Sequence, residues 1–159
     1  MLVVIAEKEE LKLVEELGYE EYPVIITGVG AMNVIKALKD IPRDTEILNI
    51  GYCGSNYYEV GSNVFVRKVM TLHEKTKFYE EPRYCNIWNY EDDLYCADCY
   101  TSTDFVEKTK IKEPCVFDME LAFIRALFND VTAIKVVSDK LSLEQYKTKI
   151  NKNKGENKW

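Results

Sequence analysis

Short apolar runs rich in β-branched residues alternate with amphipathic stretches along this chain, and this alternation constrains its fold more than any other feature. The runs that predict buried strands are 2–6, 24–27, 46–50, 63–70, 99–102, 115–117 and 132–137. The stretches that predict helices are 7–17, the segment from 31 to about 40, a brief helix after 102, 118–128 and the segment after Ser142. Strands that alternate with helices favour a parallel sheet covered on both faces. We therefore predict an α/β fold, a three-layer sandwich with a mixed, largely parallel central sheet.

The length and charge of the chain limit the number of domains and the kinds of partner that we expect. A chain of 159 residues fits one domain, which we place at 1–150, followed by a polar, Lys-rich tail at 151–159 that we expect to be solvated. The net charge of -6 argues against general nucleic-acid binding. No apolar run is long enough to span a bilayer, and no signal-peptide pattern is visible. We expect a cytoplasmic protein with neither a membrane nor a nucleic-acid partner.

The cysteines leave one alternative open. Cys96 and Cys99 form a CxxC pair, with Cys85 and His73 upstream, so a zinc site or a redox motif is conceivable. A structural zinc site usually combines two such closely spaced couples, and this chain has one. Free thiols in a reducing compartment are the favoured interpretation, and we predict no metal and no cofactor.

Three acidic residues lie where an α/β fold gathers its ligands, near the carboxyl ends of strands. Glu10 shares a helical stripe with Leu13, Val14 and Leu17, so it faces the core. Glu120 occupies the same kind of position on the helix 118–128. A carboxylate at the buried edge of a helix must be paired, protonated or used in chemistry. Asp139 ends the last strand, and Ser142 is better placed to cap the next helix, which leaves Asp139 available as a general acid.

Two glycine-containing segments allow a backbone to approach a ligand closely. The segment 28–30 follows a strand and precedes a helix, although Asn33 stands where a dinucleotide fingerprint has its third glycine. The segment 51–55 (GYCGS) follows the next strand and predicts either a turn against a ligand or a simple connection. The irregular region 71–98 predicts a long loop with at most one strand.

Taken in order, several of these segments resemble the nucleoside phosphorylase and nucleosidase family, which includes purine nucleoside phosphorylase and methylthioadenosine/adenosylhomocysteine nucleosidase. The matching segments are 3–11 (VVIAEKEEL), 27–30 with Asn33, 49–54 (NIGYCG), 60–64 (VGSNV), 102–106 (STDFV), 118–122 (DMELA) and 137–139 (VSD). The likeness covers about positions 1 to 145. The chain is similar to a shortened member, lacking an early hairpin and most of the closing helix, and Tyr52 stands where a small residue is usual.

The resemblance implies roles for individual residues. Glu10 matches the acid that activates the attacking water, and Asp139 matches the acid that protonates the purine base. Glu120 matches the acid that holds the ribose hydroxyls. Phe105 matches the aromatic residue that stacks on the base, and Met119 matches the residue that packs under the sugar. The other substrate-binding positions that the resemblance implies are Gly30, Tyr52, Cys53, Gly54 and Ser138. The resemblance also implies a homo-oligomer, a dimer in this family.

The implied reaction is hydrolysis of the N-glycosidic bond of a purine nucleoside or deoxynucleoside. Phosphorolysis is the first alternative, but the glycine turn of the hexameric phosphorylases supplies an arginine and a serine where this chain has Asn49 and Tyr52. A nucleoside-binding protein without catalysis is the second alternative, and a zinc or redox protein built on Cys96 and Cys99 is the third.

Overall fold

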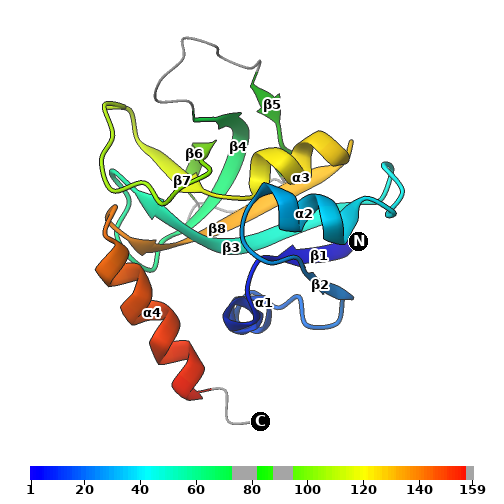
Figure 1. Ribbon diagram of the computed structural model, residues 1–159, viewed down its shortest axis with the longest axis horizontal. Coiled ribbons are helices and arrows are strands. Elements are labelled where there is room, and N and C mark those ends of the chain that lie inside the picture. Colours follow the sequence, from blue (N-terminus) through cyan, green and yellow to red (C-terminus); the bar gives the residue numbers. More distant parts are fainter. Residues whose placement is uncertain (73–81, 88–94, 157–159) are drawn as a thin grey trace.

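The computed structural model describes residues 1–72, 82–87 and 95–156, in which one mixed sheet is flanked by helices (Figure 1). The described strands are β1 Leu2–Ile5, β2 Val24–Ile26, β3 Ile47–Ser55, β4 Asn63–Thr71, β5 Arg83–Tyr84, β6 Tyr95–Thr101, β7 Cys115–Asp118 and β8 Val131–Asp139. The helices are α1 Leu11–Glu16, preceded by a 3₁₀ turn at Lys8–Glu10, α2 Ala31–Leu38, α3 Leu121–Leu127 and α4 Leu143–Glu156. The α/β class and the mixed sheet predicted from the sequence are confirmed.

The sheet closes on itself. β3 pairs with both β7 and β8, β7 pairs with β6, β6 with β4, and β4 returns to β8, so five strands form a closed ring. Outside this ring, β1 pairs in parallel with the first residues of β3 and β2 pairs in parallel with β1, whereas β7 against β3 and β8 against β4 are antiparallel. The predicted three-layer sandwich is not confirmed, because a small closed barrel takes the place of an open central layer.

Helices cover both sides of the sheet. α2 and α3 bury Val34, Leu38, Leu121 and Ile124 in one hydrophobic cluster with β4, β6 and β8. α1 and α4 belong to a second cluster, on the side of β1 and β3 that carries Tyr52. The segments 47–55 and 131–139 are buried along their whole length, and β3 and β8 contribute residues to both hydrophobic clusters.

Two local predictions are wrong. The segment 51–55 is not a turn, because β3 continues through it to Ser55 and pairs with β8 along the way. The brief helix expected after Ser102 is absent, and residues 103–114 run as irregular chain to β7. Of the irregular region 71–98, the structure describes β5 and the start of β6, and 73–81 and 88–94 lie outside the described residues.

The Lys-rich segment that the sequence predicts to be a solvated tail is helical as far as Glu156. Tyr146, Ile150 and Asn153 share one stripe of α4 at helical spacing, and this stripe packs against β3 and α1. Asn153 is only 3% exposed, and its side-chain amide donates to the Tyr52 hydroxyl at 2.7 Å and to the carbonyl of Glu9 at 3.4 Å. The large residue at position 52 thus anchors the C-terminal helix.

In the part of the chain that the structure describes, no helix is long and apolar enough to cross a membrane.

Replacing Tyr52 with Phe tests this anchor. The variant removes a buried acceptor and leaves one N–H of the Asn153 amide without a partner, so we expect it to lower the free energy of unfolding by about 1–3 kcal/mol. Urea denaturation followed by circular dichroism measures the change. Tyr57→Phe is the matched control, because this residue is 62% exposed, and its effect should stay within about 0.5 kcal/mol. Equal effects of the two variants would contradict the anchoring role.

Candidate active site

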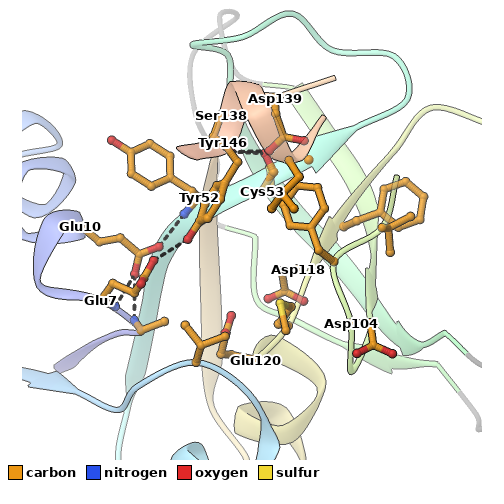
Figure 2. Close-up of a pocket in the computed structure, with 18 residues that line it drawn as sticks. Glu7, Glu10, Tyr52, Cys53, Asp104, Asp118, Glu120, Ser138, Asp139 and Tyr146 are labelled. Carbon is orange, nitrogen blue, oxygen red and sulfur yellow. Dashed lines mark hydrogen bonds between the residues drawn. The ribbon is translucent and has the colours of Figure 1, made fainter. Parts of the chain in front are cut away.

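A pocket of about 330 Å³ lies where the carboxyl ends of β1, β3, β7 and β8 meet the start of α4 (Figure 2). Nine of the ten substrate or catalytic residues predicted from the sequence line it: Glu10, Tyr52, Cys53, Gly54, Phe105, Met119, Glu120, Ser138 and Asp139. Gly30 does not line the pocket, but its N–H donates a hydrogen bond to Glu120, which does. Positions separated by up to 129 residues along the chain therefore meet at one cavity.

The carboxyl group of Glu10 is held in place by backbone amides. It ends the 3₁₀ turn after β1 and is 5% exposed. Its Oε1 accepts the N–H of Tyr52 at 2.8 Å, and its Oε2 accepts the N–H groups of Ala6 at 2.8 Å and Glu7 at 3.1 Å. Burial raises the pKa of Glu10, while these amides and the charge of Lys135 oppose that rise. The side chain is fixed in place and faces the pocket.

Two glycines of β3 make room for two of the acids. A Cβ atom at Gly51 would lie 3.0 Å from Glu10 Oε1, and one at Gly54 would lie 3.0 Å from Asp139 Oδ1. Real Cβ contacts are almost never shorter, so a side chain at either position would push a carboxylate away. The glycine pattern that looked like a turn in the sequence is instead a strand whose bare backbone lets the acids approach.

A β-bulge directs Asp139 into the site. The pairing of β3 with β8 shifts register between Cys53 and Gly54, so that Gly54 faces Asp139. Ser138 donates its hydroxyl proton to Asp139 Oδ2 at 2.7 Å or to the carbonyl of Cys53 at 3.1 Å. Burial raises the pKa of Asp139, and hydrogen bonds from Ser138 and from the backbone of Ser142 and Leu141 oppose that rise.

Asp139 also has a structural role, whereas the sequence analysis predicted that Ser142 would leave it available as a general acid. Its Oδ1 accepts the N–H of Ser142 at 3.1 Å, at the start of α4. The turn between them contains Leu141 at a φ of 61°, a left-handed conformation that costs a branched residue energy. Ser142 still caps the helix, because its hydroxyl accepts the N–H of Gln145 at 3.2 Å. Asp139 therefore both faces the pocket and holds the strand-to-helix turn.

Glu120 comes from the junction of β7 and α3 and is 8% exposed. Its Oε1 accepts the N–H of Gly30 at 3.2 Å, across the turn that opens α2. Gly30 has a φ of 89°, which only glycine adopts at low cost, so this residue aims its N–H at the carboxylate. Burial, together with the nearby charge of Asp118, raises the pKa of Glu120 to about 8.

A buried ion pair beneath the pocket was missed by the sequence analysis. Lys135 Nζ lies 2.8 Å from Asp118 Oδ2, and the two side chains are 1% and 0% exposed. Asp118 also accepts the hydroxyl of Thr101 at 2.5 Å and the N–H of Leu121 at 2.9 Å. Asp118 keeps the pKa of Lys135 raised, and Lys135 holds that of Asp118 below its usual value despite burial. The only signal for Lys135 was a lysine inside the apolar run 132–137.

Aromatic and aliphatic side chains form the rest of the wall. Phe105 lies on the irregular chain after β6, and its ring centroid is 5.6 Å from that of Tyr146 on α4. Phe117, Met119, Val29 and Leu143 add apolar surface. Tyr146 and Glu7 were not predicted as site residues, because their contact joins positions 139 residues apart. Such a wall accommodates a flat, partly apolar ligand.

The ionisable acid and base side chains of described residues that line the pocket are all acids. Six of its lining residues are acids: Glu7, Glu10, Asp104, Asp118, Glu120 and Asp139. Among the described residues that line it, none is a lysine, arginine or histidine. A ligand with several negative charges would be repelled, whereas a neutral ligand rich in hydroxyl and amino groups would find many acceptors.

The CxxC pair does not form a compact thiol site. Cys96 and Cys99 lie three residues apart on β6, so they point to opposite faces, and Cys96 is exposed while Cys99 is buried. Burial keeps the pKa of the Cys99 thiol well above its usual value. Within 1–72, 82–87 and 95–156, no cluster of three or more His, Cys, Asp or Glu could hold a metal ion. His73 lies outside the described residues.

Known structures share this fold. A nucleosidase (MTAN) from Chlamydia trachomatis, bound to MTA, aligns with a TM-score of 0.72 and 17% identity, covering 98% of this chain and 93% of that one. Futalosine hydrolase of Helicobacter pylori gives 0.70 and 12%, covering 96% and 91%. The 5′-methylthioadenosine/S-adenosylhomocysteine nucleosidase of Helicobacter pylori gives 0.67 and 10%, covering 96% and 91%. The nucleosidase-like fold expected from the resemblance is confirmed. No protein-family model and no curated protein sequence matches the chain.

Replacing Lys135 with Met tests the buried pair. The variant leaves Asp118 buried without its cation, so we expect a loss of about 3–5 kcal/mol in the free energy of unfolding, measured by urea denaturation. Adding Asp118→Asn should recover at least half of that loss. Lys12→Met is the control, because the Lys12–Glu16 pair is partly exposed and should contribute less than about 1 kcal/mol. Additive effects of Lys135→Met and Asp118→Asn would contradict a direct interaction.

The raised pKa of Glu120 predicts a pH-dependent stability. The folded protein holds this proton up to a pH of about 8, whereas the unfolded chain releases it near 4.5, so the contribution of Glu120 to stability falls as pH rises between these values. Relative to Glu120→Gln, the wild type should lose more than about 1 kcal/mol across this window in urea denaturation. Glu113→Gln, at an exposed position, should track the wild type. A parallel pH profile for wild type and Glu120→Gln would argue against the shift.

Proposed function

We propose that this protein is an N-glycosidase that hydrolyses a purine nucleoside or deoxynucleoside without a cofactor. The observation that carries the proposal is the meeting of Glu10, Glu120 and Asp139 at one pocket, each fixed by hydrogen bonds and supplied by a different element. The fold shared with nucleosidases and futalosine hydrolase supports the same class of reaction.

The chemistry assigns a different task to each acid. Loss of a purine leaves an oxocarbenium-like sugar, so the reaction benefits from a proton donor at the base and a carboxylate that orients water on the other side. Asp139, whose pKa is raised by burial, suits the donor role toward the base. Glu10, which accepts three backbone N–H groups, suits the ionised partner of the water.

Glu120 and the apolar wall would position the nucleoside. A carboxyl group at the start of α3 can bind the two ribose hydroxyls, with Met119 beneath the sugar. Phe105 offers a ring for stacking on the base, and Ser138 fixes the orientation of Asp139. Tyr52, Cys53 and Gly54 contribute the floor of β3, and Gly30 reaches the sugar only through its bond to Glu120.

The charge of the pocket favours water over phosphate as the nucleophile. A phosphorylase must hold a dianion beside the sugar, which calls for cations such as arginine. The described wall instead supplies six carboxyl groups, and Asn49 is turned away, donating to the carbonyl of Val4 at 3.0 Å. Lys135, a buried cation beneath the pocket, is neutralised by Asp118.

A panel of purine nucleosides assayed for free base tests the proposal. We expect release in phosphate-free buffer with free sugar as the second product. Asp139→Asn should slow turnover by roughly two to four orders of magnitude, and Glu10→Gln by roughly two or more. Asp44→Asn and Glu20→Gln, at exposed positions, are the matched controls and should retain activity.

Each other outcome has a definite meaning. Release that requires phosphate and yields a sugar 1-phosphate would replace hydrolysis with phosphorolysis. Nucleosides that bind but stay intact under both conditions would identify a binding protein without catalysis. Normal turnover by Asp139→Asn would remove Asp139 from the mechanism.

A further inference from the structure

Two polar residues of the pocket wall have no task in the proposed reaction. Glu7 follows β1, and Tyr146 lies in the first turns of α4. The Tyr146 hydroxyl donates to Glu7 Oε2, so the two side chains meet across the cavity, as Figure 2 shows. Both are half-buried, which makes them accessible to a ligand and partly shielded from solvent.

The position of this pair is fixed from both sides. The Glu7 side chain and the Glu10 backbone form one half of a reciprocal capping arrangement, and the Glu10 side chain and the Glu7 N–H form the other. Tyr146 packs beside Phe105 and belongs to the stripe of α4 that Asn153 anchors to Tyr52. Burial and the neighbouring Glu7 carboxylate raise the pKa of Tyr146, so its hydroxyl stays protonated and keeps a proton to donate.

The roles proposed for the other acids indicate what lies against this pair. With the base at Asp139 and Phe105, the ribose hydroxyls at Glu120 and the water at Glu10, the remaining substituent of the sugar is its 5′ carbon. Glu7 is three residues from Glu10, in the same turn, and it lies on the wall that those roles leave unassigned.

We propose that Glu7 and Tyr146 form a polar subsite for the 5′ position of the sugar, so that the protein selects nucleosides with a free 5′-hydroxyl over those with an apolar 5′-thioether. This inference rests on the proposed function. A 5′-hydroxyl inserted between the two side chains can donate to the Glu7 carboxylate and accept the Tyr146 proton, so that two hydrogen bonds replace the direct Tyr146–Glu7 bond.

Other 5′ groups fit this subsite less well. A thioether offers no donor and only a weak acceptor, and it would strip solvent from Glu7 without replacing the lost hydrogen bonds. A 5′-phosphate would be repelled by the Glu7 carboxylate, which lines the same part of the pocket. The subsite therefore predicts unmodified nucleosides as the substrate class.

Rates with adenosine and with its 5′-deoxy-5′-methylthio analogue test the subsite. For the wild type, kcat/KM should favour adenosine by roughly tenfold or more, since a polar site left unpaired discriminates strongly. Glu7→Met should abolish or reverse that preference, and Tyr146→Phe should reduce it. Glu7→Gln, which keeps the size of the side chain, should lower the preference without loss of the fold. Lys8→Met, at the exposed neighbouring position, is the matched control and should keep the wild-type ratio.

Calorimetric binding of both nucleosides to Asp139→Asn separates this inference from the proposed function. Tighter binding of adenosine with no release of base by the wild type would support the subsite while hydrolysis failed. Release of base from both nucleosides at equal rates, or faster from the thioether, would overturn the subsite and leave hydrolysis standing. Binding of neither nucleoside would overturn both.

Discussion

The buried pair of Lys135 and Asp118 is the interaction on which the rest of the site depends. Burying a carboxylate without a partner is costly, and here Asp118, Glu120 and Glu10 all lie beneath or beside one cavity. Lys135 lies on the central strand β8, 2.8 Å from Asp118, and its charge also acts on Glu10 and Glu120. One buried cation therefore allows several acids to be buried close together, and its ion pair with Asp118 neutralises its own charge.

Backbone N–H groups supply most of the remaining compensation for burying these carboxyl groups. Glu10 takes three amide N–H groups, Glu120 takes one from Gly30, and Asp139 takes one from Ser142 as well as the Ser138 hydroxyl. The absence of side chains at Gly51 and Gly54 is what lets two of these carboxyl groups lie against β3. The same bonds that stabilise the acids also fix their directions, so the site is organised before any ligand binds.

Helix α4 links the stability of the fold to the shape of the pocket. Its start is held by Asp139, its middle packs through Ile150, and its end is anchored by Asn153 on Tyr52. Tyr52 in turn donates its backbone N–H to Glu10. Tyr52 therefore contacts the proposed water-activating acid through its backbone and the helix that carries Tyr146 through its side chain.

The sequence by itself determined the α/β class, most strands and helices, and the acids Glu10, Glu120 and Asp139, because burial periodicity and strand ends are local properties of the chain. It did not determine the closure of the sheet, since that depends on β4 pairing with β8 and β7 with β3 across long separations. It misjudged 51–55, because a glycine pattern looks the same in a turn and in a strand that leaves room for acids. Only the tertiary structure decided that Lys135 pairs with Asp118 and that Glu7 meets Tyr146, because such contacts join residues that no local pattern connects.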